Sequence, residues 1–416
     1  MPNRGWNSVQ LEDVLDSVFA GAWGESPTDF RKPNVRVLRA TNIDSEGRVD
    51  YSHPALRVLE TREISRKRLH PGDLLLEASG GGPGTPVGRV AVHNVQSDEL
   101  DYICSNFFRV LRPNADLVHP AYLAHLLVAA YRSPRIWRYQ QQTTGLVNLK
   151  LGDYLKQSLW IPPMHEQARI VEILAGFEAA EQGIDASISK FRNVRHGALL
   201  TSMASVGSEN PASGWARVPL KSIVPSAEYG VSEALDRDAR GVPVLRMNNI
   251  QSGRIDADDL RYCPVPVPAK LFLRSGDVLF NRTNSMEHIG KAAMWRDELP
   301  SATFASYLVR LVPDLQRVTP EYLVEWLMHP LVRQRVRSIS TVAVQQVNVN
   351  PTRLRELEID LPVDLAEQRR IVAMLEACDE QIEHENEELN KLRELKRGLV
   401  DDLLSGRRVT ASGVAA

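Results

Sequence analysis

The chain has 416 residues, of which 43% are hydrophobic and 25% charged, so it is long enough for two or three domains that each bury a core. No apolar run reaches the roughly 18–20 residues of a membrane helix, and the first residues lack the charged-then-apolar layout of a signal peptide. Three widely spaced cysteines fit neither a disulfide framework nor a metal-ligand spacing, so we expect reduced thiols in a cytoplasmic protein with no membrane contact.

The net charge of −2 hides an uneven distribution of charged residues. Residues 1–160 and residues 215–360 each hold 19 Lys and Arg against 17 Asp and Glu, so both segments are mildly basic. The acidic excess lies in residues 161–214 and 361–416. Charge therefore permits a nucleic-acid partner for the two basic segments without demonstrating one.

The first basic segment begins with short runs that predict β-strands. "VRVLRATNI", "DLLLEA", "VGRVAVH" and "YICSNFFRVLRP" are rich in β-branched and aromatic residues and are interrupted by Gly and Pro. "PAYLAHLLVAAY" then predicts a helix with proline in its first turn. A polar stretch, "YQQQTTGLVNLK", and a last strand, "SLWIPP", lead into a long helix. These elements predict an α+β domain followed by a helix.

The same elements return in the same order about 200 residues later. "GWNSVQLEDV" from Gly5 is matched by "GWARVPLKSIV" from Gly214, "HPGDLLLEASGG" by "RSGDVLFNRTNS", and "VHPAYLAHLL" by "VTPEYLVEWL". Further matches join "VLRATNI" to "VLRMNNI", "FFRVLRP" to "YLVRLVP" and "LVNLK" to "QVNVN". Ordered matches at one long period indicate a tandem duplication in which each copy is a whole domain plus a helix.

Both long helices begin with one motif, in which a proline and a short polar step precede Glu-Gln, Arg and Ile-Val. Its polar members are Glu166, Gln167 and Arg169 in the first copy and Glu367, Gln368 and Arg370 in the second. The proline fixes the exit from the last strand, and we expect the Glu and Gln of the first turn to suit the exposed N–H groups of the helix.

Each long helix also carries a narrow apolar stripe that suits pairing with one other helix. Apolar residues recur at steps of three and four, Val194 and Leu395 among them, and Glu181 and Glu385 interrupt the stripes. The residues expected to pair are Ile170, Leu174, Phe177, Ile184, Ile188, Phe191, Ile371, Leu375, Ile382, Leu389, Leu392 and Leu399. At about 35 residues each helix is about 50 Å long, too long to bury its stripe against one compact domain. We expect the helices to pair with each other; two independent surface helices are the alternative.

No catalytic constellation stands out in the sequence. The glycine cluster "SGGGPGTPVGR" lacks the Gly-Lys-Ser/Thr ending of a phosphate loop and continues into a strand. The ten histidines show no metal-site spacing, and the base-methylation motif Asn/Asp-Pro-Pro-Tyr/Phe does not occur. We therefore expect a chain that is not an enzyme and holds neither a metal nor a cofactor.

Polar and basic residues gather instead at corresponding places in the two copies. Arg and Lys hold phosphates or guanine edges, and Asn and Gln pair with adenine. The candidate DNA-binding residues are Arg66, Lys67, Arg68, Arg89, Arg135, Arg138, Gln141, Thr143, Thr144, Arg246, Asn248, Arg282, Asn284, Lys291, Arg335, Arg337, Ser340 and Gln345. Their identities differ between the copies, as reading two different half-sequences requires.

The doubled Glu-Gln helix starts, the repeated Gly-Asp strand and the opening Gly-Trp resemble the specificity (S) subunit of type I restriction–modification systems over nearly the whole chain. The resemblance implies an α+β tandem duplication of two globular target-recognition domains separated by two long antiparallel coiled-coil spacer helices. It also implies double-stranded DNA with a bipartite site as a partner. Two methyltransferase (M) subunits, which use S-adenosylmethionine, and restriction (R) subunits are the protein partners it implies.

The repeat and the resemblance together predict six segments. They are target-recognition domain 1 at 1–160, spacer helix 1 at 161–205, a linker at 206–214, target-recognition domain 2 at 215–360, spacer helix 2 at 361–405 and a flexible tail at 406–416. Two alternatives stay open. One is an S-like DNA-recognition subunit of another phage-defence complex, and the other is a coiled-coil assembly scaffold without DNA readout.

Overall fold

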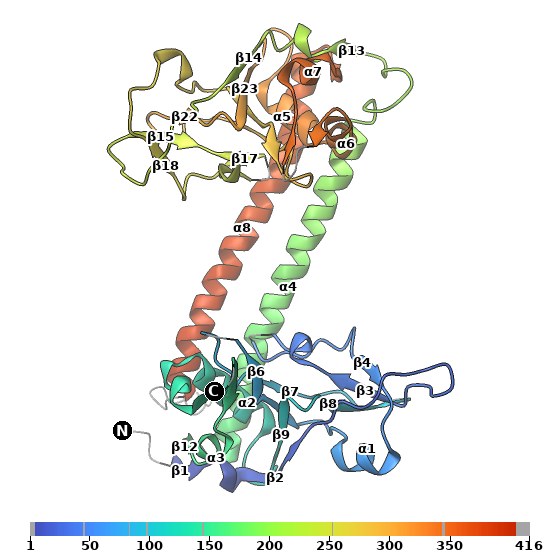
Figure 1. Ribbon diagram of the computed structural model, residues 1–416, viewed down its shortest axis with the longest axis vertical. Helices are drawn as coiled ribbons and strands as arrows, with labels where there is room; N and C mark the ends of the chain where they lie inside the picture. Colours follow the sequence, from blue (N-terminus) through green and yellow to red (C-terminus); the bar gives the residue numbers. More distant parts are fainter. Residues whose placement is uncertain are drawn as a thin grey trace, which may run out of the picture. The chain divides into compact units, whose positions relative to one another are not determined.

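The computed structural model describes residues 5–404 apart from residues 45, 83, 97–98, 144, 252 and 343–345. The chain forms two compact units, unit 1 with residues 1–184 and 388–416 and unit 2 with residues 185–387 (Figure 1). Each unit contains one globular body and a stretch of each of the two long helices. The tail predicted at 406–416 lies outside the described residues.

Unit 1 is built from three small sheets, a strand pair and helices that cover them. Its strands are β1 (Asn7–Gln10), β2 (Leu15–Ala20), β3 (Val35–Leu38), β4 (Ala55–Arg57), β5 (Leu74–Glu77), β6 (Ser79–Gly81), β7 (Val90–Val92), β8 (Asp101–Cys104), β9 (Phe108–Pro113), β10 (Gln140–Thr143), β11 (Leu146–Leu149) and β12 (Ser158–Ile161). The helices are α1 (Thr61–Lys67), α2 (Pro120–Arg132), α3 (Leu151–Leu155) and the first part of α4 (Met164–Ser202). The sheet orders are β2-β9-β5-β7, β4-β3-β8 and β10-β11-β6, and β1 pairs with β12.

Unit 2 repeats this plan with a second set of elements. Its strands are β13 (Trp215–Pro219), β14 (Ser226–Tyr229), β15 (Val242–Leu245), β16 (Ile250–Gln251), β17 (Arg254–Ile255), β18 (Arg261–Cys263), β19 (Val278–Asn281), β20 (Thr283–Asn284), β21 (Ala292–Met294), β22 (Thr303–Phe304), β23 (Leu308–Val312), β24 (Thr341–Val342), β25 (Val347–Asn348) and β26 (Glu358–Pro362). Its helices are α5 (Pro320–Met328), α6 (Pro330–Ser338), α7 (Pro351–Glu356) and the first part of α8 (Leu365–Leu404).

Every sheet of unit 1 has a counterpart in unit 2 with the same strand order. The sheets β14-β23-β19-β21, β18-β15-β22 and β24-β25-β20 and the pair β13-β26 match the four arrangements of unit 1. Even the parallel pairing recurs, since β3 runs parallel to β8 and β15 runs parallel to β22. The α+β tandem duplication predicted from the sequence is therefore confirmed strand by strand.

The core of each unit lies between its four-stranded sheet and the helix that follows it. In unit 1, Leu74 and Leu76 of β5 pack with Tyr122, Leu123 and Leu127 of α2 in one buried cluster. In unit 2, α5 packs against β19 and β21 in the same way. The inward side chains, every second residue of a strand and every third or fourth residue of the helix, thus pack against each other on one face of the sheet. This packing fixes where the loops at the ends of the sheet lie.

The two long helices pair within each unit, and the pairing is antiparallel. In unit 2, Ser187 donates to Glu385 at 2.9 Å and Arg195 donates to Asp379 at 2.6 Å, so the residue number falls in α8 as it rises in α4. In unit 1, the beginning of α4 and the end of α8 share one buried cluster that includes Leu174. Paired helices, and not two independent surface helices, are what the structure shows.

None of the twelve residues expected to pair the helices is fully exposed. Ile170, Leu174, Ile188, Ile371, Leu375 and Leu389 are buried, and Phe177, Ile184, Phe191, Ile382, Leu392 and Leu399 are half-buried. Two other members of the predicted stripes lie on the solvent side, because Val194 is 49% exposed and Leu395 is 66% exposed. The stripe is therefore narrower than the sequence pattern indicated.

Candidate nucleic-acid interface

A buried glutamine ties the start of α4 to the loop before α2. The Oε1 of Gln167 accepts a hydrogen bond from the backbone N of His119 at 2.8 Å. Its Nε2 donates to the backbone O of Pro162, at the end of the strand that leads into the helix, at 2.9 Å. One side chain therefore satisfies backbone groups on two segments that are far apart in the sequence.

Gln368 makes the equivalent bonds at the start of α8. It accepts from Thr319 N at 2.9 Å and donates to Pro362 O at 2.8 Å and to Arg317 O at 2.9 Å. The expectation that this glutamine would serve the free N–H groups of its own helix is wrong, because the side chain turns back toward the preceding loop. The neighbouring Glu367 is instead ion-paired with Arg370 at 2.7 Å, at the surface.

Replacing Gln368 with alanine should lower the free energy of unfolding by about 2–4 kcal/mol, since the substitution leaves several buried backbone groups without partners. Arg370→Ala is the matched control, because it lies in the same turn but removes only an exposed ion pair of small energetic value. Thermal and urea unfolding of the two variants checks this. Equal unfolding midpoints for both would contradict a stabilising role for the buried glutamine.

The repeated Gly-Asp pair positions a buried carboxylate against an arginine in each unit. Arg112 holds Asp73 through two bonds of 2.7 Å. Arg310 donates to Asp277 at 3.2 Å, where burial raises the pKa of the Asp277 carboxyl. The aspartates occupy equivalent positions, but the arginines come from different positions along β9 and β23. This motif therefore braces the central sheet and is not a ligand site.

An arginine at the same loop position in each unit joins the globular body to a long helix. Arg48 contacts Glu181 of α4 at 3.1 Å, and Arg254 contacts Glu383 of α8 at 3.0 Å. The buried carboxylate of Glu181 also accepts from Lys396 of α8 at 3.4 Å. Glu181, which interrupts the apolar stripe of α4, is therefore the point at which the body and both helices of unit 1 meet.

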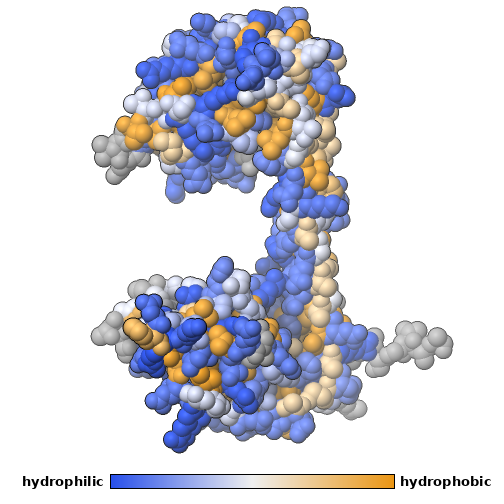
Figure 2. All heavy atoms as spheres, turned by 90° about the vertical axis from the view of Figure 1, so that its right-hand side faces the viewer, coloured by the Kyte–Doolittle hydropathy of each residue, from blue (hydrophilic) through white to orange (hydrophobic). Residues whose placement is uncertain are grey.

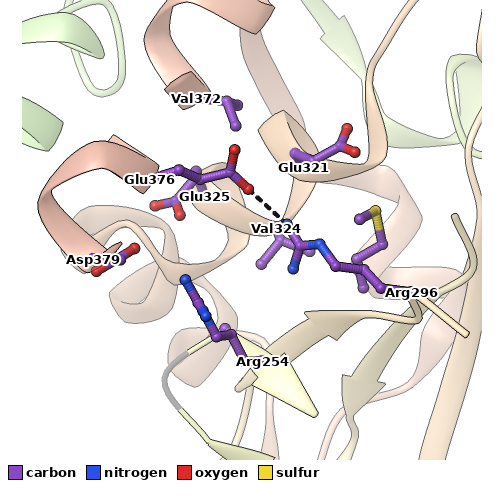
Figure 3. A pocket seen from close by; sticks show the side chains of 10 residues that line it. Arg254, Arg296, Glu321, Val324, Glu325, Val372, Glu376 and Asp379 are labelled. Carbon is purple, nitrogen blue, oxygen red and sulfur yellow. Dashed lines mark hydrogen bonds and ion pairs between the residues drawn. The ribbon is translucent and has the colours of Figure 1, made fainter. Parts of the chain in front are cut away.

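Unit 2 has a small acidic pocket where α5 and α8 face the loops of the sheet, as Figure 3 shows. Arg296 crosses it to Glu376 of α8 at 2.7 Å. On its far side, Arg195 of α4 binds both Asp379 and Glu325, at 2.6 Å and 2.7 Å. Burial raises the pKa of Glu325. Because arginines hold three of its four carboxylates, those of Glu325, Glu376 and Asp379, we interpret this pocket as a contact that docks the helices.

The hairpin sheets carry the polar stretches that the sequence singled out. In unit 1, Gln141 is exposed in β10, whereas Gln140 is turned inward and donates to Val87 O at 3.0 Å. The edge strand of each hairpin sheet is fixed by a matching bond, from Ser79 to Asn148 at 2.5 Å and from Thr283 to Asn348 at 2.7 Å. The same kind of hydrogen bond therefore fixes both hairpins, while the side chains on their outer faces differ.

The structure places the predicted DNA-binding residues in three groups. The exposed ones are Arg66, Arg68, Arg135, Arg138, Gln141, Asn248 and Arg337. The half-buried ones are Lys67, Arg89, Arg246, Arg282, Asn284, Lys291, Arg335 and Ser340. Thr144, Gln345 and the side chain of Thr143 lie outside what the structure describes.

Several of these residues already have partners within the chain. Arg89 donates to Glu77 at 2.8 Å, which raises the pKa of its guanidinium, and also to Ile43 O at 2.8 Å, so groups inside unit 1 hold its guanidinium. Arg246 is paired with Asp259 at 2.8 Å. The Ser340 hydroxyl donates to Arg337 O at 2.6 Å. Sequence alone counts such groups as available because it does not show their partners.

Sequence reasoning missed the exposed aromatic residues beside these polar groups. Phe107, Trp137 and Tyr307 are each between two fifths and half exposed. Tyr307 lines a pocket of about 300 Å³ together with Arg246 and Asn248. In the face shown in Figure 2, hydrophobic residues form small groups among hydrophilic ones on each globular body. The sequence signal was a pair of adjacent apolar residues, Phe107-Phe108 and Tyr307-Leu308, and it does not show which of the two side chains faces outward.

Two stretches of the chain, residues 3–190 and residues 212–394, match the family described as the type I restriction modification DNA specificity domain. The chain belongs to this family. The match to both copies agrees with the doubled architecture and confirms the resemblance to type I specificity subunits.

Two type I specificity subunits from other organisms share part of this sequence. The chain is 24% identical over 397 residues to the EcoKI specificity subunit of Escherichia coli, covering 90% of this chain and 82% of that one. It is 31% identical over 194 residues to the MjaX specificity subunit of Methanocaldococcus jannaschii, a match that spans 46% of this chain and about half, 45%, of the relative.

Two solved structures share the fold. A chain from a study of the complex assembly and conformational transition of the type I R-M system has a TM-score of 0.58 and 19% identity, covering 98% of this specificity subunit and 100% of that chain. The type I S subunit from M. genitalium has a TM-score of 0.55 and 13% identity, with 97% of each chain covered.

In the part of the chain that the structure describes, no three His, Cys, Asp or Glu side chains are arranged so that they could hold a metal ion. Among those same residues, no helix combines the length and the apolar character needed to span a bilayer. Cys104 and Cys263 are buried and unpaired, and burial raises the pKa of the Cys104 thiol to about 12.

Proposed function

We propose that this specificity subunit reads a bipartite site in double-stranded DNA, with one half of the site read by each globular body. The observation that carries the proposal is the strand order shared by three sheets and one strand pair of the two bodies, combined with different exposed polar side chains. A common scaffold with different reading residues suits two half-sites of unequal sequence, because base edges are distinguished by the side chains that meet them.

The exposed residues supply the chemistry that such reading needs. Unit 1 presents Gln141, Arg135 and Arg138, and unit 2 presents Arg337, with the half-buried Arg335 on the same helix. Arginine binds guanine or phosphate, and glutamine pairs with adenine in the major groove. Arg335 and Arg337 are two of the three arginines of α6, and neither is ion-paired among the described residues, so both keep their charge available for a DNA phosphate or base.

We further propose that the chain anchors two methyltransferase subunits, and through them restriction subunits, while performing no chemistry itself. The doubling of the scaffold supports this, because two equivalent surfaces suit two copies of one partner. S-adenosylmethionine would then be bound by the partner methyltransferase. The sequence of this chain shows no motif for that cofactor.

Mapping methylated bases in DNA from cells that carry this chain with the methyltransferase of its own system tests the proposal. We expect one split recognition sequence that disappears when this chain is deleted. The purified chain alone should neither methylate nor cleave DNA. Methylation that persists at the same sequence without this chain would contradict a reading role and favour an assembly scaffold.

A further inference from the structure

In both units one exposed aromatic residue occupies the same turn of the fold. Phe107 stands between β8 and β9 and is 44% exposed, and Tyr307 stands between β22 and β23 and is 46% exposed. The next residues, Phe108 and Leu308, are fully buried, so the alternation of the strand turns the preceding ring outward. A single exposed ring is common on a protein surface. One that recurs at the equivalent turn of a divergent copy suggests a shared use.

The backbone of both turns is fixed to the strand that leads into the hairpin sheet. Phe107 O accepts from Ala78 N at 2.8 Å, and Tyr307 O accepts from Arg282 N at 3.1 Å. Ala78 directly precedes β6, and Arg282 directly precedes β20. Each ring is therefore held at the junction between the central sheet and the hairpin sheet that carries the polar stretch.

An arginine guanidinium binds the backbone of the residue before each ring, and that of Arg282 also lies over the ring of Tyr229, 5.0 Å from its centroid. Arg109 Nη1 donates to Asn106 O at 3.2 Å, and Arg282 Nη1 donates to Ser306 O at 3.2 Å. Asn106 and Ser306 are the residues directly before the two rings. In the part of the chain that the structure describes, neither arginine is ion-paired with a carboxylate, in contrast to the arginines that brace the central sheet. Each turn thus combines an exposed ring with a positive charge that no acid neutralises.

The surroundings of both rings contain residues of the kind that contact DNA. A Cβ on Gly80, in the edge strand of the hairpin sheet, would lie 3.7 Å from the Phe107 ring. Only two strand spacings, about 10 Å, separate that edge from β10 and its exposed Gln141. In unit 2 the ring of Tyr307 lines the same pocket as Asn248. Aromatic rings among basic and amide groups are typical of surfaces that contact bases.

We propose that Phe107 with Arg109, and Tyr307 with Arg282, form one DNA contact in each half of the site. The ring packs against a base edge in the groove, such as the methyl group of a thymine, and the guanidinium binds the adjacent phosphate. The inference rests on the proposed reading function and names the residues that would make one of its contacts with DNA. The two arginines come from different sequence positions, so the two copies share the position of the contact in the fold and not a sequence motif.

The test uses the full chain with its methyltransferase and duplexes that carry the mapped site. Phe107→Ala should weaken specific binding roughly tenfold or more and relax the unit 1 half-site alone, and Tyr307→Ala should do the same for the other half-site. Leu56→Ala and Val265→Ala are matched controls, since both residues are 46% exposed apolar groups elsewhere on the same units. Arg109→Gln should lower the slope of log affinity against log salt by about one.

The outcomes separate this inference from the function on which it rests. If the wild-type complex shows no sequence preference, the reading function fails. If the wild type discriminates but the ring variants bind and methylate as the controls do, only the aromatic contact is overturned. Circular dichroism and unfolding midpoints equal to wild type for Phe107→Ala would show that lost binding does not arise from misfolding.

Discussion

Exchanging residues 215–360 for the same region of another type I specificity subunit should change one half of the methylated sequence and leave the other half intact. The globular body of unit 2 has its own sheets and its own buried core, so it can be replaced without rebuilding unit 1. Each mismatched base pair costs roughly 1–3 kcal/mol, so an exchanged half-site should abolish methylation at the original sequence. Methylation mapping of the exchanged protein measures both halves at once.

The reciprocal exchange of residues 1–160 is the control, and it should change the opposite half. The exchange points should spare Gln167 and Gln368, because each ties its helix to the globular body before it. Simultaneous change of both half-sites in either exchange would be incompatible with two independent readers.

Leu389→Asp should be among the most destabilising single changes in the chain. Leu389 is 4% exposed on α8, and burying a leucine contributes about 1.5–3 kcal/mol, which the substitution loses while adding a buried charge. We expect a loss of roughly 3–5 kcal/mol in the free energy of unfolding. Extending the change to Leu392, which is half-buried on the same helix, should separate α8 from its partner further.

Leu395→Asp is the matched control, because Leu395 lies on the same helix but is 66% exposed. It should unfold close to the wild-type temperature and keep DNA binding in the assembled complex. Thermal unfolding followed by circular dichroism at 222 nm compares the two variants. Indistinguishable melting of both would mean that the paired helices contribute little to stability.

The doubled fold was predictable because the strand-like runs and the apolar stripes are local patterns, and the repeat shows each of them twice. Each depends on residues within about ten positions of one another, and each copy provides an independent reading of the same pattern. The stripe was predicted too broadly, however. Leu395 fits the three-and-four spacing, but which edge of a stripe faces the partner depends on the crossing of the two helices, which spacing does not determine.

The candidate interface was predictable only in outline. Sequence located the polar stretches of the hairpins, but it treated Arg89 as unpartnered when the buried Glu77 accepts from it. It assigned Gln167 to the wrong backbone groups for the same reason. Both errors concern partners more than ten residues away, and partners at that distance depend on tertiary structure. Phe107 was missed because nothing in a strand-like run distinguishes an outward ring from a buried one.

The arginines that hold the two Gly-Asp aspartates come from different positions in β9 and β23, and this difference restricts how the two halves of the gene can recombine. Asp73 is held by Arg112, and Asp277 by Arg310, whose position in its strand corresponds to Val110. A crossover within this strand that joined the start of β9 to the end of β23 would leave a buried aspartate with no arginine. The reciprocal product would place two arginines against one aspartate. Since an unpaired buried carboxylate costs several kcal/mol, we expect surviving hybrids between the copies to exchange this strand whole.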